Sequence, residues 1–125
     1  MKHILVAVLF VAAIALLHAY KPEGALVRFS NKSNEDFLQV TARIGGKEFV
    51  FNELKAGNET PFTLIGKTFL TGYFKVVTVK DTLEYSPSAD EIIKQDEYSK
   101  GRFVMELSIK NENGRRVLFL NSYRK

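Results

Sequence analysis

Hydrophobic and polar residues alternate along most of the chain from residue 25 onward, which is the period of a half-buried β-strand. The clearest run is 38–44, where polar side chains share one face and the apolar ones share the other. The apolar face of this run consists of Leu38, Val40, Ala42 and Ile44. Since Gly, Asn, Asp and Pro separate the successive runs, the pattern predicts a series of short strands joined by turns.

Two dipeptides mark tight hairpin turns. Gly45-Gly46 follows the run 38–44 and leads into a return strand at 47–52, in which Phe49 and Phe51 face together. Asn113-Gly114 joins the run 102–109 to a final strand. Both pairs suit a two-residue turn, which requires positive φ angles. The sequence therefore predicts two antiparallel hairpins.

The remaining runs complete a series of about eight strands. In the run 60–65 we expect Phe62 and Leu64 to share a face, and we predict one long central strand at 68–80, bent or bulged at Gly72. Short strands spaced about ten residues apart predict an all-β fold, an antiparallel β-sandwich with immunoglobulin-like architecture. The predicted strands cover 26–30, 38–44, 47–52, 60–65, 68–80, 83–86, 102–109 and 116–120.

The alternation stops between Pro87 and Gly101. Ser88 and Glu91 have the spacing of a capping box, in which each side chain bonds the other residue's backbone N–H. We expect one short helix or ordered loop near 88–96, with Ile92 and Ile93 packed against the sheet.

The N-terminus has the pattern of a signal peptide: a basic start followed by an apolar run from Ile4 to Leu17. That run is 14 residues long, whereas a spanning helix needs about 20, so we expect no transmembrane anchor. We expect a signal peptide at 1–19, cleaved after Ala19, and a single domain at 20–125. The predicted location is secreted or periplasmic.

Composition removes most catalytic and metal chemistry from the mature chain. The sequence contains no Cys, and both histidines, His3 and His18, lie in the expected leader. Zinc, copper and haem sites rely on Cys and His, and most nucleophilic hydrolases need a His base. A Ser-Lys pair stays open, although no motif singles one out. We therefore expect no enzyme and no cofactor, and we identify no catalytic, cofactor-binding or metal-binding residue.

Paired carboxylates occur in the predicted loops and are interpreted as solvated charge. Glycoside hydrolysis uses two carboxylates across a cleft, but no cleft-forming insertion surrounds these pairs. A calcium site is the other alternative, yet residues 90–97 lack the ligand spacing of a dedicated loop. The pairs are Glu35 and Asp36, Asp90 and Glu91, and Asp96 and Glu97.

The charge of the chain is mildly basic. The full sequence has a formal net charge of +4, which becomes +3 without Lys2. Basic residues are spread among acidic ones, so we expect no nucleic-acid binding. The C-terminal cations are interpreted as a solvated hairpin and tail, with a docking patch for an acidic partner as the alternative: Arg115, Arg116, Arg124 and Lys125.

Aromatic residues leave one possibility for recognition. Ten Phe and five Tyr are present, and Phe at alternating positions is typical of a core. Tyr73, Tyr85 and Tyr123 either join that core or form an exposed platform for a sugar or a partner protein.

Three segments carry a resemblance to a known group. Residues 53–62, the strand 73–76 and residues 98–109 together resemble small exported bacterial β-sandwich proteins of unknown function, which have a signal peptide plus one immunoglobulin-like domain. Many members carry a Cys for lipid anchoring, and this chain has none. The resemblance carries over no functional residues.

These observations predict an exported, non-enzymatic β-sandwich that works as a binding or interaction module of the bacterial envelope or extracellular space. The expected partner is another protein or an envelope component. The alternative is a small-ligand or carbohydrate-binding domain.

Overall fold

The computed structural model describes residues 24–125. The expected signal peptide at 1–19 and its cleavage site lie outside this range. Within it the chain forms eight strands and one short helix: β1 Ala25–Asn31, β2 Phe37–Ile44, β3 Lys47–Leu54, β4 Thr63–Gly66, β5 Tyr73–Val77, β6 Thr82–Tyr85, α2 Ala89–Lys94, β7 Gly101–Glu112 and β8 Arg115–Arg124.

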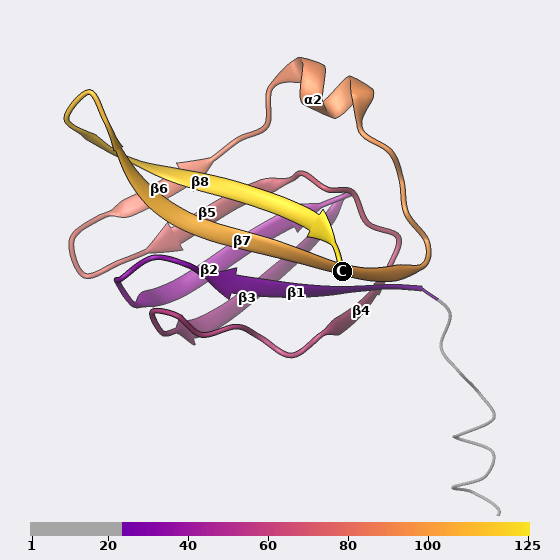
Figure 1. Cartoon of the computed structure of the whole chain (residues 1–125), viewed down its shortest axis with the longest axis horizontal. Helices are drawn as coiled ribbons and strands as arrows, with labels where there is room; N and C mark the ends of the chain where they lie inside the picture. The colour runs from indigo at the N-terminus through magenta and orange to yellow at the C-terminus, as the bar shows by residue number, and fades with distance from the viewer. Residues whose placement is uncertain (1–23) are drawn as a thin grey trace, which may run out of the picture.

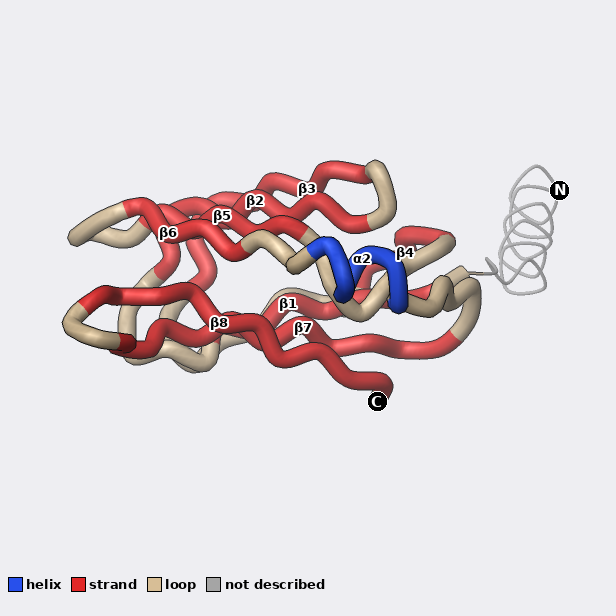
Figure 2. Tube along the Cα trace, turned by 90° about the horizontal axis from the view of Figure 1, so that it is seen from above, coloured by secondary structure: helices blue, strands red, loops and turns tan. Residues whose placement is uncertain are grey.

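The strands form two four-stranded sheets, which Figure 2 shows edge-on as two layers. The first sheet has the order β4-β1-β7-β8 and the second has the order β3-β2-β5-β6. Figure 1 shows the same strands from the face of the sandwich. The predicted all-β sandwich with one short helix is confirmed.

Both predicted hairpin turns are present. Gly45 and Gly46 have φ angles of 57° and 79°, and Asn113 and Gly114 have 50° and 79°. Strand β8 continues to Arg124 instead of ending at Leu120 as predicted, because its pairing with β7 extends over most of both strands.

One strand pair is parallel, which the sequence did not indicate. Val27 in β1 lies opposite Phe103 in β7 with the two strands running the same way. Every other pair of neighbouring strands is antiparallel. The parallel pair joins segments more than 70 positions apart, so no turn signal marks it, and it places β1 in the interior of the first sheet.

The core lies between the two sheets and is rich in aromatic rings. Phe29 is 4% exposed, and its ring centroid lies 6.1 Å from that of Phe74 in the other sheet. Burial of such side chains is the main stabilising contribution in a chain without disulfides. The buried cluster consists of Ala25, Val27, Phe29, Phe37, Val40, Ala42, Ile44, Leu54, Ile65, Phe74, Val76, Phe103, Met105, Leu107 and Leu118.

The predicted single strand at 68–80 is wrong. Only Tyr73–Val77 forms a strand, central in its sheet, while Thr68 pairs with Tyr98 through two backbone hydrogen bonds of 2.8 Å. The break occurs because β4 and β5 belong to different sheets, so residues 67–72 must cross between them. At Gly72 the chain passes so close to Arg43 that a Cβ would lie 2.5 Å from the Arg43 carbonyl oxygen.

Phe62 and Leu64 share a face as expected, and it is the outer face of the sheet. Ile65 is buried and Leu64 is 41% exposed, so β4 turns Ile65 toward the core. Phe62 precedes the strand, which begins at Thr63. The short strand is fixed by its pairing with β1, where Leu64 lies opposite Leu26 on the outer side.

The helix is confirmed, but its expected packing is wrong. Glu91 donates its N–H to the Ser88 hydroxyl at 3.2 Å, as the capping box predicts. Ile92 and Ile93 are 51% and 79% exposed. Tyr85 donates to the Glu91 carboxylate at 3.1 Å, so the polar side of α2 faces the sandwich and the isoleucines face outward. Figure 1 shows α2 standing apart from the strands.

Candidate functional site

The two long sides of the sandwich differ. On one side β6 and β8 contact each other, and Arg116 of β8 bonds the Asp81 carboxylate in the turn before β6 at 2.9 Å. The other side lies between the edge strands β3 and β4, which belong to different sheets. The sandwich is therefore closed by contacts on the first side and open on the second.

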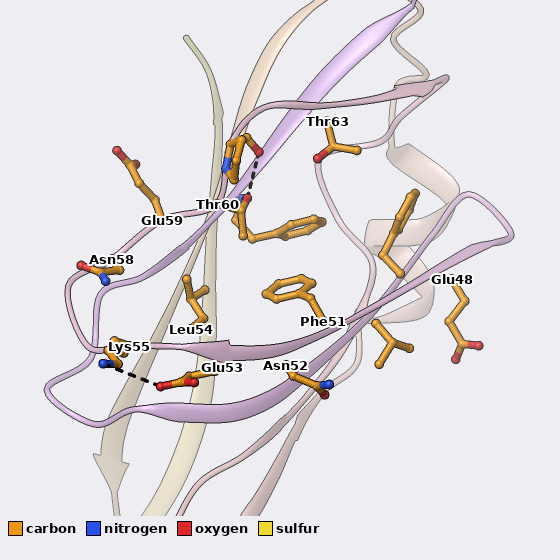
Figure 3. A pocket seen from close by; sticks show the side chains of 14 residues that line it. Glu48, Phe51, Asn52, Glu53, Leu54, Lys55, Asn58, Glu59, Thr60 and Thr63 are labelled. Carbon is orange, nitrogen blue, oxygen red and sulfur yellow. Dashed lines mark hydrogen bonds and ion pairs between the residues drawn. The ribbon is translucent and has the colours of Figure 1, made fainter.

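A groove occupies the open side, with a cavity volume of about 950 Å³. We call it the β3 groove. Figure 3 shows Phe51 between β3 and the facing segment that carries Thr60 and Thr63. The groove is lined by residues 48–55 of β3 and the loop after it, by Phe29, and by Asn58, Glu59, Thr60, Pro61 and Thr63.

The floor of the β3 groove is aromatic. The Phe29 ring centroid lies 5.4 Å from that of Phe51 and 6.4 Å from that of Phe49. Phe29 is buried, whereas Phe49 and Phe51 are half-buried. The rings of Phe49 and Phe51 thus pack against Phe29 and remain partly in contact with solvent at the open side.

Two hydrogen bonds between the sheets mark the ends of the groove. At one end Lys47 donates from Nζ to the Ile65 carbonyl oxygen at 2.6 Å. At the other end the buried Asn31 donates from Nδ2 to the Leu54 carbonyl oxygen at 2.9 Å. The aromatic floor therefore lies in a slot of defined length along β3.

The two walls present their backbone differently. The wall at 57–60 is bonded to β1, for example by the Thr60 N–H to the Phe29 carbonyl oxygen at 2.8 Å. Among residues 24–125, β3 pairs only with β2. A two-residue turn makes Ile44 and Lys47 a hydrogen-bonded pair.

Bonding then alternates along the antiparallel pair. The backbone groups of Phe49 and Phe51 therefore bond β2. The residues that alternate with them point their backbone groups toward the free edge of β3. The N–H and C=O groups that face the free edge belong to Glu48, Val50 and Asn52, and all three residues are exposed.

The carboxylates at the rim are in exposed ion pairs. Glu48 lies 3.0 Å from Arg43, and Glu59 lies 3.3 Å from Arg28. Glu53 lies 3.8 Å from Lys55. Figure 3 shows Glu48 and Glu59 pointing away from the Phe51 ring. The groove therefore offers apolar contact and backbone hydrogen bonding.

Glu53 adopts a strained backbone conformation at the end of β3. Its φ angle is 60°, which non-glycine residues rarely adopt. This conformation turns the chain so that the next side chain, Leu54, enters the core with 5% exposure. Glu53 and Leu54 both line the groove at this end of β3.

The three tyrosines do not form one platform. Tyr85 faces inward opposite Phe74, whereas Tyr73 lies on the outer face of the same sheet and Tyr123 on the outer face of the other. Loss of solvation and a bond to Glu84 raise the pKa of Tyr73, and loss of solvation and a bond to Glu91 raise that of Tyr85.

The carboxylate pairs predicted in loops are dispersed. Glu35 bonds Arg116, and Asp36 accepts the Ala56 N–H at 2.9 Å. Glu97 lies 3.6 Å from Lys67. In the part of the chain that the structure describes, no three His, Cys, Asp or Glu side chains gather where they could hold a metal ion.

The interpretation of Arg116 as solvated charge is wrong. Arg116 bonds Glu35 at 2.6 and 2.9 Å and Asp81 at 2.9 Å, and these bonds lower the pKa of both carboxyl groups. The partners are 81 and 35 positions away in the chain, so no local pattern reveals the cluster. Arg124 lies 5.6 Å from the Phe103 ring centroid, against the sandwich.

The sequence did not predict the β3 groove. Alternation correctly placed Phe49 and Phe51 on one face of the strand. Because a face covered by a neighbouring segment and an open face have the same alternation, the pattern could not indicate a groove. The pairing of 57–60 with β1, which leaves the edge of β3 free, depends on contacts between distant segments.

Comparison with known proteins supports the fold. No protein-family model and no curated protein matches the chain. Within residues 24–125, no helix is long and apolar enough to cross a membrane. The chain is similar to a solved NMR structure of a protein from Eubacterium rectale, with 17% sequence identity and a TM-score of 0.53. The match covers 78% of this chain and 88% of the other, and it shows a shared fold.

Proposed function

We propose that the protein is an exported, non-enzymatic binding module that holds an extended segment of another protein in the β3 groove. The observation that carries this proposal is the aromatic slot beside a free strand edge. The signal-peptide pattern at 1–19 supports a role in the bacterial envelope or extracellular space.

Strand addition suits the chemistry of this slot. An added strand obtains affinity from main-chain hydrogen bonds and specificity from pockets for alternate side chains. Glu48, Val50 and Asn52 supply the backbone groups, and the half-buried rings of Phe49 and Phe51 supply the apolar contact. We expect the bound segment to place apolar side chains over these rings at every second position.

The free edge of β3 carries a risk of uncontrolled self-association, because unpaired strand edges template further pairing. Lys47 and Glu48 place charges at one end of the strand, and Glu53 bends the other end. These features limit pairing to the central residues of β3, which is consistent with a short extended partner.

A second candidate is a small apolar ligand or a carbohydrate held over the same rings. The observation that favours it is the volume of about 950 Å³, which lies within the range of small-molecule sites. Such a ligand requires the rings but not the backbone groups of β3, so the two candidates respond differently to substitution.

The test uses selection of random, unstructured peptides on the exported protein. Val50→Pro removes one outward N–H without removing a bond to β2, and an edge strand tolerates Pro. The matched control is Val50→Thr, which keeps the N–H. We expect peptides selected on the natural chain to bind V50T and to lose at least tenfold in affinity on V50P.

Two results would oppose strand addition. Failure to select any peptide rejects the proposal, and equal binding to V50P and V50T rejects the backbone contact. If V50P instead retains binding of an apolar dye or an oligosaccharide while Phe51→Ser loses it, the small-ligand candidate is favoured. Thermal melts of each variant establish that the fold is retained.

A further inference from the structure

The outer face of the β4-β1-β7-β8 sheet concentrates the positive charge of the molecule. Six cations lie on it: Arg28, Lys32, Arg102, Lys110, Arg115 and Lys125. Three carboxylates accompany them: Glu59, Glu106 and Glu112. The excess on this face is therefore +3.

This excess equals that of the whole described chain. The sequence has 18 Lys and Arg, of which Lys2 and Lys21 precede residue 24, and 14 Asp and Glu, of which Glu23 precedes it. Residues 24–125 thus have a formal charge of +3. All other surfaces of the described chain balance to zero, so the molecule is electrically polarised toward this one face.

One end of the face holds three cations around a single ring. The Phe62 centroid lies 4.2 Å from Arg28 Cζ, 5.4 Å from Arg102 Cζ and 5.6 Å from Lys125 Nζ. Arg28 is fixed there, because its Nε donates to the Thr60 carbonyl oxygen at 2.9 Å. Glu59 pairs with Arg28 at 3.3 Å, so three cations share one carboxylate at this end, and a ligand anion would balance the remaining positive charge.

The other end repeats the combination of cation and ring. Lys110 Nζ lies 4.1 Å from the Phe119 centroid, and Lys32 lies 3.5 Å from Glu106 in the same region. These residues border a shallow hollow of about 440 Å³. Cations therefore occur at both ends of the sheet face.

Exposed apolar side chains accompany these cations on the same outer face. Leu64 and Tyr123 are both 41% exposed, and Phe119 is 36% exposed. Adjacent apolar and basic side chains match the boundary of a bilayer, where rings enter the headgroup layer and cations meet phosphates. An acidic polypeptide would satisfy the charges, but it would leave these distributed apolar side chains without a matching layer.

We infer that this face docks on the surface of an anionic phospholipid bilayer, with Arg28, Arg102 and Lys110 against the phosphates and with Phe62 and Phe119 at the headgroup level. This site lies on a sheet face and is distinct from the β3 groove, which it adjoins at Glu59 and Thr60. A single molecule can hold a partner segment and a membrane surface at once.

The test measures sedimentation of the exported protein with vesicles. One set contains phosphatidylcholine with phosphatidylglycerol, and the other contains phosphatidylcholine alone. The test variant is Arg102→Gln with Lys110→Gln, since neither side chain makes a hydrogen bond within the described chain. The matched control, Lys75→Gln with Lys94→Gln, removes the same charge from the second sheet and from α2.

We expect the protein to bind the anionic vesicles only. Each cation near an anionic surface raises the partition coefficient by roughly a factor of five. The test variant should therefore have a partition coefficient about tenfold or more lower, and the control variant should be unchanged. Phe119→Ser in an otherwise natural chain is expected to weaken binding as well. Complete displacement by inorganic phosphate or polyphosphate would show a soluble anion site instead. Displacement of this kind would overturn the inference. Equal binding to both vesicle types, or no binding to either, would also overturn it. So would an equal loss of binding in the test and control variants.

Discussion

Both terminal nitrogens of Arg116 donate hydrogen bonds to the Glu35 carboxylate, at 2.6 and 2.9 Å, although the two residues are 81 positions apart in the chain. Its Nε also bonds Asp81 at 2.9 Å. One side chain of β8 thereby ties the loop before β2 to the turn before β6. The cluster links the two sheets on the closed side of the sandwich. The groove lies on the opposite side of the sandwich.

Replacing Arg116 by Gln should lower the melting temperature. The change removes the cation that both carboxylates bond and leaves their mutual repulsion without compensation. The measurement is a thermal melt followed by circular dichroism. The control is Arg115→Gln, an exposed neighbour in the same hairpin, for which we expect little change. Equal melting temperatures for R116Q and the natural chain would show that the cluster is not stabilising.

Acid should weaken the same cluster. The bonds to Arg116 hold the pKa of Glu35 and of Asp81 below their ordinary values of 4.5 and 3.8. A depressed folded-state pKa contributes stability that is present above the unfolded value and is lost as pH falls through the folded value. We expect the denaturation midpoint to be constant from neutral pH to about pH 5 and to fall below about pH 4.5. R116Q should show a shallower fall, and parallel curves for the two proteins would contradict this account.

Phe29→Ala should be strongly destabilising. Phe29 is 4% exposed and contacts rings from both β3 and β5, and truncation of a buried Phe costs about 3–5 kcal/mol. The comparison is Phe51→Ala, which removes a half-buried ring and is expected to cost less. Urea unfolding gives both values. A smaller loss for F29A than for F51A would mean that the groove floor, and not Phe29, is the centre of the core.

Gly72→Ala should be destabilising although its backbone is not in the left-handed region. A Cβ there would lie 2.5 Å from the Arg43 carbonyl oxygen and 3.0 Å from Ile44 Cγ1. Overpacking of this kind costs about 1–3 kcal/mol. Urea unfolding of G72A measures it, and an unchanged midpoint would show that the crossing between β4 and β5 is looser than described.

Local patterns were sufficient for most strands, both hairpins and the helix start. Gly45-Gly46 and Asn113-Gly114 determine turn geometry within a few residues, and Ser88 caps its own helix. The errors occur where segments far apart decide the outcome. Residues 68–72 have the composition of a strand, yet they cross between the sheets, and Ile92 and Ile93 face outward because Glu91 bonds Tyr85.

The candidate site was less predictable than the fold. A strand with one apolar face has the same alternation whether a neighbour covers its edge or not, so the pattern at 47–52 could not show that β3 is open. The asymmetry of the two sides arises from the pairing of 57–60 with β1 and from the bonds of Arg116. Neither leaves a local signature in the sequence.

The most direct test of the β3 groove is amide hydrogen exchange of the protein, with and without a peptide selected on it. In the free protein we expect fast exchange at Glu48, Val50 and Asn52 and slow exchange at Phe49 and Phe51, whose N–H groups bond β2. Bound peptide should protect the first three amides selectively. Amides that exchange rapidly whether or not peptide is bound, or protection confined to the outer face of the β4-β1-β7-β8 sheet, would contradict the assignment of the groove as the binding site.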